Sequence, residues 1–435
     1  MKQINIGMLG CGTVGIGTAK ILLEKKALVT ARTGMALNVK NIADIDTERD
    51  RGLDLAPGVM TADAAAVVDD PEIDIIVELI GGTTVAKDLV LRAIDNGKSI
   101  VTANKALLSA FGNEIFPRAA DAGVDVAYEA SVGGCMPIIK SIRESLIGND
   151  IHAMQGILNG TCNYILSKIT AEKCSFETAL KEAQEKGFAE ADPTLDVDGF
   201  DTAHKLAILN AIAYGMAINL DDIYVEGIRR ITPVDIEFAD DFGYTVKLLA
   251  ISKQIDGAVE ARVHPTMVPE DDILSSVSGS LNAVTVAGDC VENMLLYGHG
   301  AGMMPTASAV AGDIVDLARN IAFGASGRVP SLSYQAEKIQ PLPVLPMEKL
   351  STRYYFRFNA TDQPGVLSKI AGVLGGHNIS IKSVNQKGRE KNGPIPLVML
   401  THKACEADVN KALAEITSFD VVADVPMVIR IEDER

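Results

Sequence analysis

Residues 10–15 follow an apolar run, Ile4–Leu9, open a helix-like stretch, Val14–Lys26, and read Gly10-Cys11-Gly12-Thr13-Val14-Gly15. The spacing is that of a dinucleotide-binding loop. Its first glycine allows a tight turn, its second lets a pyrophosphate approach the backbone, and its third lets helix and strand pack closely. The start of the helix would offer N–H groups and partial positive charge to the phosphates. The alternative is a glycine-rich turn that serves only packing, which this position at the start of an alternating segment disfavours.

The segment around this loop, residues 1–130, alternates short apolar runs with helical stretches. Strands that alternate with helices predict a doubly wound parallel sheet of the Rossmann-like α/β class. We expect the returning segment at about 300–325 to complete this domain. The expected strands are Ile4–Leu9, Leu37–Ala43, Ile73–Leu79, Ser99–Thr102 and Val124–Tyr128, and a further helix is expected at Lys87–Asn96.

The residue that contacts the adenosine ribose is harder to assign. An acid is expected about 20 residues after the glycine loop, and the best candidates, Asp44 and Asp46, come later. An acid at that strand end favours the free 2′-hydroxyl of NAD. Because Lys40, Arg49 and Arg51 could neutralise a 2′-phosphate, we expect NAD to be preferred slightly and NADP not to be excluded.

The rest of the chain divides into two further domains. Residues 131–300 carry longer helical stretches and apolar runs, which predict an α+β domain with an open sheet. Residues 326–349 contain four prolines and read as a linker, because proline sustains neither a helix nor a central strand. Residues 350–435 follow a βαββαβ order, the ferredoxin-like plan. The expected elements include helices at Met136–Ile147, Cys162–Thr170, Phe176–Lys186 and Thr202–Tyr214, strands at Ala258–Val268 and Leu281–Val286, and a last strand at Val421–Ile431.

Bulk composition excludes several classes of function. The net charge is −17 with no Lys- or Arg-rich block, so nucleic acid is an unexpected partner. No apolar run is long enough to span a membrane, and the N-terminus has no signal-peptide pattern. The six cysteines show no CxxC pair, which indicates reduced thiols and no zinc ribbon. We therefore expect a cytoplasmic protein without membrane association.

Two segments carry charged side chains in patterns that suit catalysis. The run Thr102–Leu108 takes a strand end into a helix and places Lys105 where parallel sheets bind their ligands. The run Gly187–Lys205 crosses an acidic, Pro- and Gly-broken loop and ends with Asp201 and Lys205 at i and i+4 on one helical face. From the residues alone, a solvated acidic loop with a surface ion pair, and a surface lysine at 105, explain these patterns equally well.

Resemblance distinguishes the two interpretations. The run GFAEADPTLDVDGFDTAHK (187–205) resembles the signature of the homoserine dehydrogenase family, and TANKALL (102–108), NGTCNYIL (159–166) and GHGAGMMPTASAV (298–310) are also similar to that family. The resemblance covers essentially the whole chain. It implies NAD(P)-dependent interconversion of L-aspartate 4-semialdehyde and L-homoserine, a catalytic and dimerisation role for residues 131–300, and assembly as a homodimer or homotetramer. Because the chain starts at the first nucleotide-binding strand, we expect the single-activity form.

The resemblance also implies roles for individual residues. Lys205 would be the proton donor and acceptor, Asp201 would orient it, and Lys105 would steady the developing negative oxygen between cofactor and substrate. Glu190 with Asp196 would hold the substrate ammonium. The remaining expected contacts are Thr161 and Gly187 with the substrate, and Gly10, Gly12, Thr13, Val14, Gly15, Asp44, Thr102, Lys105 and Gly302 with the cofactor.

Two further sites follow from resemblance. A sodium ion would bind Glu129 and the carbonyls of Val132, Gly134 and Met136, mostly backbone oxygens that suit a hard cation. Residues 350–435 resemble an ACT domain, whose expected effector is threonine. Domain pairing would place the effector near a shared interface, and a purely oligomerising domain is the alternative. The expected effector contacts are Asp362, Gly365, Val366 and Asn378.

Two other functions remain open from the sequence. A semialdehyde dehydrogenase that forms a thioester needs a nucleophilic cysteine, and Cys135 in its glycine-rich loop is the candidate. A protein that senses amino acids without catalysis would need neither Lys105 nor the pair Asp201 and Lys205. The six histidines show no ligand spacing, and we assign none of them to a metal.

Overall fold

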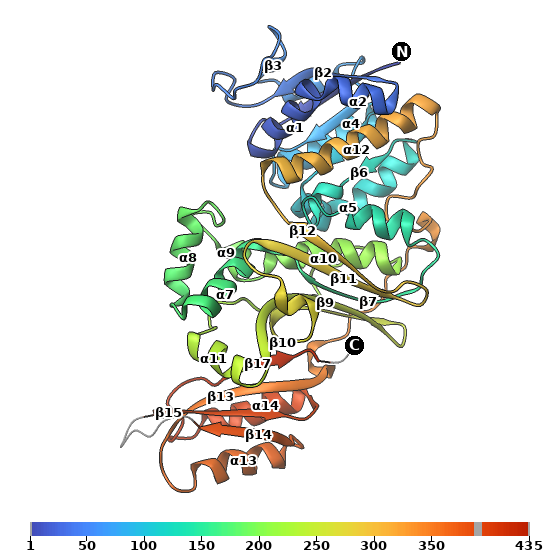
Figure 1. Ribbon diagram of the computed structural model, residues 1–435. Helices are drawn as coiled ribbons and strands as arrows, with labels where there is room; N and C mark the ends of the chain where they lie inside the picture. The colour runs from blue at the N-terminus through green and yellow to red at the C-terminus, as the bar shows by residue number, and fades with distance from the viewer. Residues whose placement is uncertain (1, 387–393, 434–435) are drawn as a thin grey trace.

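The computed structural model describes residues 2–386 and 394–433. The molecule is elongated, with the N-terminal sheet at one end, a large mixed sheet in the middle and the C-terminal domain at the other end (Figure 1). Among the described residues, no helix has both the length and the apolar character needed to cross a bilayer.

The N-terminal domain is a parallel sheet of six described strands in the order β3-β2-β1-β4-β5-β6. The order reverses between β1 and β4, and ligands of such sheets bind at this reversal, beyond the carboxyl ends of the strands. The predicted Rossmann-like fold is confirmed. Its elements are β1 (Gln3–Leu9), α1 (Thr13–Glu24), α2 (Lys26–Thr33), β2 (Ala36–Ala43), β3 (Met60–Thr61), α3 (Ala64–Asp69), β4 (Ile75–Glu78), α4 (Thr84–Asp95), β5 (Ser99–Thr102), α5 (Lys105–Asp121) and β6 (Val126–Ala127).

A long helix far along the chain, α12 (Met303–Phe323), returns to this domain and packs along α1, as Figure 1 shows. A Cβ at Gly17 of α1 would lie 2.9 Å from the Met303 carbonyl and from Ala307 Cβ, so glycine is required for this close approach. The apolar side chains Val310, Ile314 and Leu317 of α12 are buried against the sheet.

The middle domain is built on a mixed sheet. Antiparallel strands follow the order β12-β11-β7-β9-β10. Helices α7 and α10 pack on them, and α8 packs on α7 (Figure 1). Its elements are η1 (Glu129–Ser131), α6 (Ile138–Lys140), η2 (Ser141–Ser145), β7 (Ile151–Ile157), α7 (Gly160–Glu172), α8 (Phe176–Glu185), α9 (Thr194–Val197), α10 (Phe200–Tyr214), β8 (Tyr224–Val225), α11 (Pro233–Asp241), β9 (Tyr244–Ile255), β10 (Ala258–Pro269), η3 (Ile273–Ser276), β11 (Leu281–Gly288) and β12 (Glu292–His299).

The C-terminal domain has the predicted βαββαβ order, with a sheet order β17-β13-β15-β14. Buried aromatic residues of β13, Tyr354, Phe356 and Phe358, pack against the two helices. Two short 3-10 helices, η4 (Ala336–Lys338) and η5 (Met347–Lys349), lie in the preceding segment 326–349. The elements of the C-terminal domain are β13 (Ser351–Thr361), α13 (Val366–Gly376), β14 (Ile381–Gln386), β15 (Pro394–Thr401), β16 (Ala404–Cys405), α14 (Glu406–Thr417) and β17 (Met427–Ile431).

The middle and C-terminal domains share one sheet. Strand β17 pairs in parallel with β10, through Thr266 with Arg430 and Met267 with Ile431, and antiparallel with β13 on its other side. A hydrogen-bonded sheet therefore runs without interruption from the middle domain into the C-terminal domain, and β17 belongs to both.

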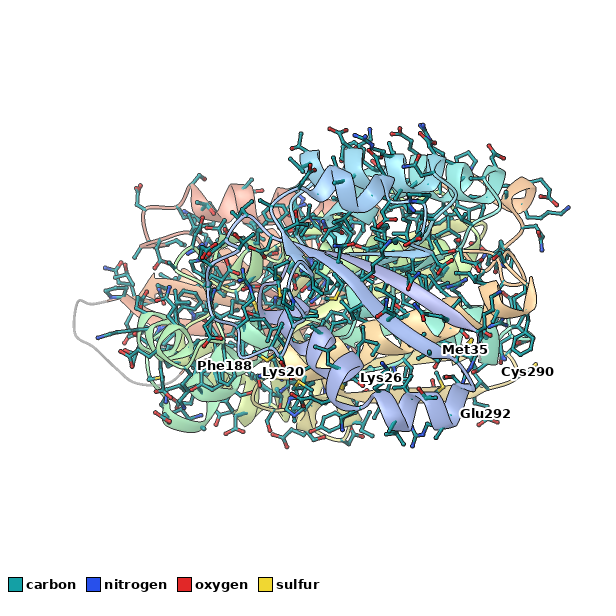
Figure 2. All side chains as sticks on the ribbon, turned by 90° about the horizontal axis from the view of Figure 1, so that it is seen from above. Lys20, Lys26, Met35, Phe188, Cys290 and Glu292 are labelled. Carbon is teal, nitrogen blue, oxygen red and sulfur yellow. The ribbon has the colours of Figure 1, made fainter. Side chains whose placement is uncertain are left out.

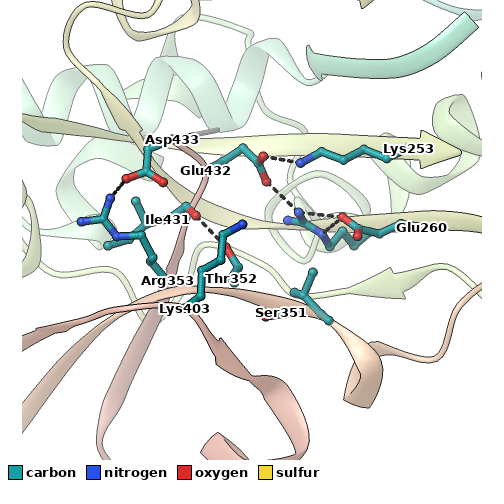
Figure 3. Close-up of a pocket in the computed structure, with 11 residues that line it drawn as sticks. Lys253, Glu260, Ser351, Thr352, Arg353, Lys403, Ile431, Glu432 and Asp433 are labelled. Atoms are coloured by element: carbon teal, nitrogen blue, oxygen red, sulfur yellow. Dashed lines mark hydrogen bonds and ion pairs between the residues drawn. The ribbon is translucent and has the colours of Figure 1, made fainter. Parts of the chain in front are cut away.

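Buried ion pairs also stabilise the junction between the middle and C-terminal domains. Arg262 of β10 is 2% exposed and pairs with Glu432 just after β17, and Glu432 also pairs with Lys253 of β9 (Figure 3). On the other face, Asp235 of α11 is fully buried and accepts hydrogen bonds from Arg357 Nε at 2.6 Å and from the Tyr355 hydroxyl at 3.1 Å. Removing one partner would leave a buried charge unpaired, so these contacts hold the two domains in one arrangement.

The segment 326–349 lies along the middle domain. Its backbone forms bridges from Gln340 to Met216 and from Val344 to Val259. The Tyr334 hydroxyl donates to the Ala213 carbonyl at 3.1 Å. These contacts order the proline-rich segment against the middle domain.

Several predicted elements have different bounds. The helix expected at Met136–Ile147 is short, because Met136 N–H closes a turn onto the Gly133 carbonyl and α6 starts only after Pro137; a wider π-type turn then replaces its second half. The strand expected at Val421–Ile431 starts at Met427, because Pro426 has no N–H for a ladder. The strand expected at Val124–Tyr128 is reduced to Val126–Ala127.

Candidate functional site

A cleft of about 690 Å³ lies between the carboxyl ends of the parallel strands and the middle domain. It reaches from the dinucleotide loop at Val14 to the first turn of α10. Side chains and backbone from both domains line it, including Lys105, Ser131, Asn159, Thr161, Gly187, Glu190, Asp196, Asp201, Lys205, Asn282, Gly302 and Thr306.

One carboxylate joins two lysines at the centre of this cleft. Lys205 Nζ lies 2.7 Å from Asp201 Oδ2, one turn earlier on α10, and Lys105 Nζ at the start of α5 lies 3.0 Å from Asp201 Oδ1. The side chains of Asp201 and Lys205 are each 10% exposed, whereas that of Lys105 is 37% exposed. The predicted grouping of three residues from two distant segments therefore exists.

The Lys205 ammonium is also held from the opposite side. Its Nζ donates to the Leu158 carbonyl, just after β7, at 2.6 Å. Asn159 caps α7 by accepting the Cys162 N–H at 2.8 Å, which leaves its amide group to donate to Asp201 Oδ2 at 2.9 Å and to Asp196 Oδ1 at 2.7 Å. Asn159 thus fixes the spacing of the two carboxylates.

The predictions did not include Asn159, although its motif was part of the resemblance. Asparagine three residues before Cys162 signals an N-cap, which explains it as local structure. The contact with Asp201 depends on α10 docking against α7, which no local pattern reveals.

Burial and neighbouring charges shift the pKa values of three ionisable groups in the cleft. Burial opposes ionisation of Asp201, but Lys205 and Lys105 outweigh burial and hold the pKa of this carboxyl below its ordinary value. Asp201 in turn raises the pKa of Lys105, against desolvation. Burial and the charge of Asp201 raise the pKa of Asp196. These shifts favour an ionised Asp201 and a protonated Lys105, and they make Asp196 a weaker acid than an ordinary aspartate.

The residues expected on the substrate side line the same cleft. Glu190, Asp196, Thr161 and Gly187 all contribute to its wall. The Thr161 hydroxyl donates to the Phe188 carbonyl at 2.6 Å and so ties the start of α7 to the acidic loop. This arrangement gathers carboxylates and a helix N-terminus, groups that can hold an ammonium and a carboxylate.

The glycine loop has the backbone geometry that dinucleotide binding needs. Gly10 has φ of 95°, and a Cβ there would lie 2.7 Å from the Leu79 carbonyl. A Cβ at Gly15 would lie 2.4 Å from the Gly10 carbonyl, whereas at Gly12 it would meet no described atom within 4 Å. The second glycine therefore leaves open backbone beside the α1 N-terminus, where a pyrophosphate can approach.

A second cavity of about 470 Å³ adjoins this loop and is lined by Gly10, Gly12 and Asp44. Asp44 accepts the Cys11 N–H at 2.7 Å and pairs with Arg51 at 3.0 Å. Burial raises the pKa of Asp44, but N–H donors from Asp46 and Cys11 and the Arg51 charge bring it below its ordinary value. An anion and a guanidinium thus stand together at the place expected for the ribose.

Two of the expected cofactor residues differ in exposure. Gly302 lines the cleft and caps α12 with φ of 120°, a conformation that favours glycine. Thr102 is 1% exposed, and its hydroxyl donates to Glu78 at 2.6 Å. Glu78 in turn accepts the N–H groups of Ile80 and Gly81. The Thr102 side chain therefore braces the ends of β4 and β5 and faces away from the cleft.

The expected cation site holds a buried carboxylate. Glu129 is 8% exposed, and burial raises its pKa to about 7, although the N–H groups of Lys140 and Ile139 bind it at 2.8 Å. Asp313 accepts the Glu129 N–H at 2.8 Å, and burial together with Glu129 raises its pKa as well. Such weakly compensated carboxylates fit a nearby cation. One of the expected carbonyls, that of Met136, also accepts the Ile138 N–H.

The cysteines give little support to thioester chemistry. Gly133 and Gly134 line the cleft, whereas the Cys135 thiol packs beside Gly298, where a Cβ would lie 3.1 Å from its Sγ. Cys290 is exposed in the turn between β11 and β12, and Figure 2 labels it at the opposite side of the view from Phe188, a residue of the cleft. Among the described residues, no group of three or more His, Cys, Asp or Glu side chains could hold a metal ion.

Comparison with known families agrees with this geometry over most of the chain. "Homoserine dehydrogenase, NAD binding domain" matches residues 10–129, "Homoserine dehydrogenase" matches residues 137–315, and "ACT domain" matches residues 354–420. The chain belongs to the homoserine dehydrogenase family. It is accordingly an NAD(P)-dependent oxidoreductase with a C-terminal ACT domain, as the sequence predicted.

Full-length relatives of this family are similar throughout. A homoserine dehydrogenase from Pseudomonas aeruginosa is 44% identical over 433 residues, with 99% of each chain covered, and one from Neisseria gonorrhoeae is 43% identical over 439 residues with the same coverage. The solved homoserine dehydrogenase from Thiobacillus denitrificans is 45% identical with a TM-score of 0.94, and the alignment covers 100% of this chain and 99% of that one. A hyperthermophilic archaeal homoserine dehydrogenase in complex with NADPH is 27% identical with a TM-score of 0.62, over 73% of this chain and 98% of its own.

The residues expected to bind an effector lie at two ends of one helix. Gly365 caps α13 with φ of 90°, and a Cβ there would meet no described atom within 4 Å. Asn378 lies beyond the other end of α13 and has φ of 61°. Since α13 has 11 residues, it is about 16 Å long at 1.5 Å per residue. Within one chain these residues cannot contact the same small amino acid.

Proposed function

We propose that this homoserine dehydrogenase uses Lys205 as the proton donor and acceptor for the substrate oxygen, with Asp201 and Lys105 as its partners. The observation that carries the proposal is the Asp201 carboxylate, which bonds both lysines inside the cleft. Asp201 and the Leu158 carbonyl hold the Lys205 amine at a fixed point. A proton can then be transferred at that point without a search among side-chain conformers.

The chemistry in the oxidation direction balances as follows. The Lys205 amine would accept the proton of the substrate hydroxyl, and a bound nicotinamide would supply the hydride acceptor for the substrate carbon, which leaves an aldehyde. Lys105 remains protonated because Asp201 raises its pKa, so it can stabilise negative charge on the reacting oxygen. In the reverse direction, the Lys205 ammonium returns the proton.

The acidic loop and the start of α7 would bind the amino-acid end of the substrate. Glu190, with Asp196, offers carboxylate oxygens to the ammonium group. Thr161 and Gly187 stand nearby, and the N-terminus of α7 favours the substrate carboxylate. A substrate that lacks either charged group should lose most of its affinity.

Initial rates with purified protein test this function. L-homoserine with NAD or NADP should give reduced cofactor, and L-aspartate 4-semialdehyde with reduced cofactor should consume it. A protein that binds cofactor but turns over neither compound would contradict the proposal and favour a sensor without catalysis.

Cofactor choice rests on Asp44 and Arg51. The Asp44 carboxylate can accept hydrogen bonds from both ribose hydroxyls, which favours NAD. Arg51 lies next to it and could pair with a 2′-phosphate, so NADP should also be used. Replacing Asp44 by Ser should shift the ratio of kcat/KM toward NADP, and an unchanged ratio would count against this role.

A sodium ion is proposed near Glu129, with the carbonyls of Val132, Gly134 and Met136 as further ligands. Support comes from the buried carboxylates of Glu129 and Asp313, which a cation would stabilise. Sodium chloride should raise the melting temperature more than choline chloride at equal concentration. Glu129→Gln should abolish that difference, and an equal effect of both salts on the wild type would refute the site.

Threonine is proposed as the effector of the ACT domain, through Asp362, Gly365, Val366 and Asn378. The open backbone at Gly365 and the N-terminus of α13 would receive the amino-acid carboxylate. Inhibition by threonine would make the enzyme a regulated step in threonine, methionine and isoleucine biosynthesis. Rates that do not respond to threonine would leave the domain with an assembly role.

We also propose a homodimer or homotetramer in the cytoplasm. Strand β12 stands at one end of the large sheet order and exposes 55% of Tyr297, an edge that a second copy can cover. The six cysteines are free, as expected in a reducing compartment. Sedimentation should give at least a dimer.

A further inference from the structure

Asn282 of β11 is a polar residue of the cleft that no predicted role includes. It is 0% exposed and belongs to the same cleft lining as Thr161 and Lys205. Neither its side-chain oxygen nor its side-chain nitrogen has a hydrogen-bond partner within the described residues. Buried amides in folded proteins are almost always paired, because leaving one unpaired is costly.

Two glycines leave room for this amide. A Cβ at Gly300 would lie 2.0 Å from Asn282 Nδ2, and a Cβ at Gly160 would lie 3.5 Å from Asn282 Oδ1 and 2.7 Å from the Ser280 carbonyl. The Asn282 side chain therefore occupies the space between the start of α7 and the loop that follows β12. Both neighbours also line the cleft, so the amide stands in its wall.

The two unpaired ends restrict the chemistry of the missing partner. The Asn282 oxygen needs a donor and its nitrogen needs an acceptor, next to each other in one plane. A carboxylate could satisfy only the nitrogen, and an ammonium only the oxygen. A primary carboxamide satisfies both at once through two parallel hydrogen bonds.

The position of Asn282 agrees with that chemistry. Asn282 adjoins Gly300, two residues before Gly302, which caps α12, the helix that packs on the dinucleotide domain. On its other side lies Gly160, at the substrate end of the cleft. On the proposed function, on which this inference rests, the nicotinamide ring would lie at this junction to exchange a hydride with the substrate, and the carboxamide is the hydrogen-bonding substituent of that ring.

We propose that Asn282 binds the carboxamide of the nicotinamide ring through a pair of amide–amide hydrogen bonds. These bonds fix the rotation of the ring and therefore the face that it turns to the substrate carbon. Asn282 is then a cofactor-binding residue that determines which 3-substituted pyridine dinucleotides are accepted.

Cofactor analogues test the proposal on the unaltered protein. Reduced NAD and its reduced 3-acetylpyridine analogue, which has a methyl ketone in place of the carboxamide, are titrated while cofactor fluorescence is measured. We expect the analogue to bind roughly tenfold more weakly, since one hydrogen bond to a buried partner is lost. Equal dissociation constants would overturn the proposal.

Substitutions test whether the preference for the carboxamide depends on Asn282. Asn282→Leu, close in volume, should weaken reduced NAD roughly tenfold or more and bring the ratio between the two cofactors close to one. Asn410→Leu, exposed on α14 of the C-terminal domain, should leave both dissociation constants unchanged. A raised KM for homoserine with an unchanged cofactor ratio would show that Asn282 binds the substrate and would overturn the proposal. If Asn282→Leu fails to fold, as judged by circular dichroism, the analogue titration on the wild type decides.

Discussion

At the scale of single residues, two side chains, Asp201 and Asn159, each form hydrogen bonds or ion pairs with several partners in the site. Asp201 bonds Lys205, Lys105 and Asn159, and Asn159 bonds two carboxylates and a helix N-terminus. Each side chain restricts the next, so the Lys205 amine, the proposed proton donor and acceptor, is held in one position within the cleft. Such preorganisation lowers the cost of reaching the transition state.

Substitutions of Asn159 can separate its role as the cap of α7 from its proposed role in positioning Asp201 and Asp196. Asn159→Ser should keep the cap of α7 but lose the bonds to Asp201 and Asp196, so kcat should fall roughly tenfold to a hundredfold while the melting temperature changes little. Asn159→Ala loses the cap as well and should cost a further ~1 kcal/mol of stability. Kinetics and thermal unfolding of both variants check this, and a serine variant with wild-type kcat would contradict it.

Lys247 should make stability depend on pH. It is 3% exposed, donates to the Val277 carbonyl at 2.5 Å, and burial lowers its pKa from 10.5 to about 8. Between about 8 and 10.5 the unfolded chain binds more protons than the folded chain, so this residue makes stability rise with pH across that window. The full effect is about 3 kcal/mol at 1.36 kcal/mol per pKa unit.

Lys247→Met removes that titration. Denaturant unfolding should show a smaller rise in stability between pH 8 and 10 than in the wild type. Lys181→Met, whose lysine is 78% exposed, is the matched control and should keep the wild-type slope. An identical slope for Lys247→Met would contradict the prediction.

At the scale of elements, local patterns predicted the parts that depend on neighbours in sequence. The glycine loop, α10 with its i, i+4 pair, and the βαββαβ order all follow from such patterns. The long strands β7, β9 and β12 were not predicted, since each mixes polar and apolar residues irregularly. The pairing of β17 with β10 joins residues more than 150 positions apart, and a strand that satisfies two sheets looks no different in sequence from one that satisfies a single sheet.

This pairing changes how the C-terminal domain can be tested. Deleting the residues after Leu345 would remove β17 and expose the edge of β10. It would also remove Met427, Ile429 and Ile431, whose side chains belong to the same hydrophobic core as the middle domain. A truncated chain should therefore lose stability as well as regulation. Single substitutions at the effector loop are the cleaner test.

The substitution Gly365→Ala tests the proposed effector loop without removing the C-terminal domain. Its φ of 90° costs an alanine about 1 kcal/mol, and the methyl group would block approach of a ligand to the backbone. Inhibition by threonine should weaken while the rate without threonine is retained. Gly372→Ala, in the middle of α13 with open space around it, is the control and should keep inhibition. Equal inhibition of both variants would argue against this loop as the binding site.

At the scale of the whole molecule, the proposed effector residues at opposite ends of α13 would need two copies of the chain to contact one ligand. If threonine binds between two C-terminal domains, it should favour association, and its apparent affinity should rise with protein concentration. Sedimentation velocity with and without threonine measures this, with L-serine as the control amino acid. A threonine-inhibited monomer would contradict the shared site.

The central claim is that the Lys205 amine exchanges the proton of the substrate oxygen. The most direct measurement is the rate of homoserine oxidation by Lys205→Met, together with a fluorescence titration of reduced cofactor. We predict a loss of roughly 10²- to 10⁴-fold in kcat with cofactor binding unchanged. A Lys205→Met variant that oxidises homoserine within tenfold of the wild-type rate would contradict the claim.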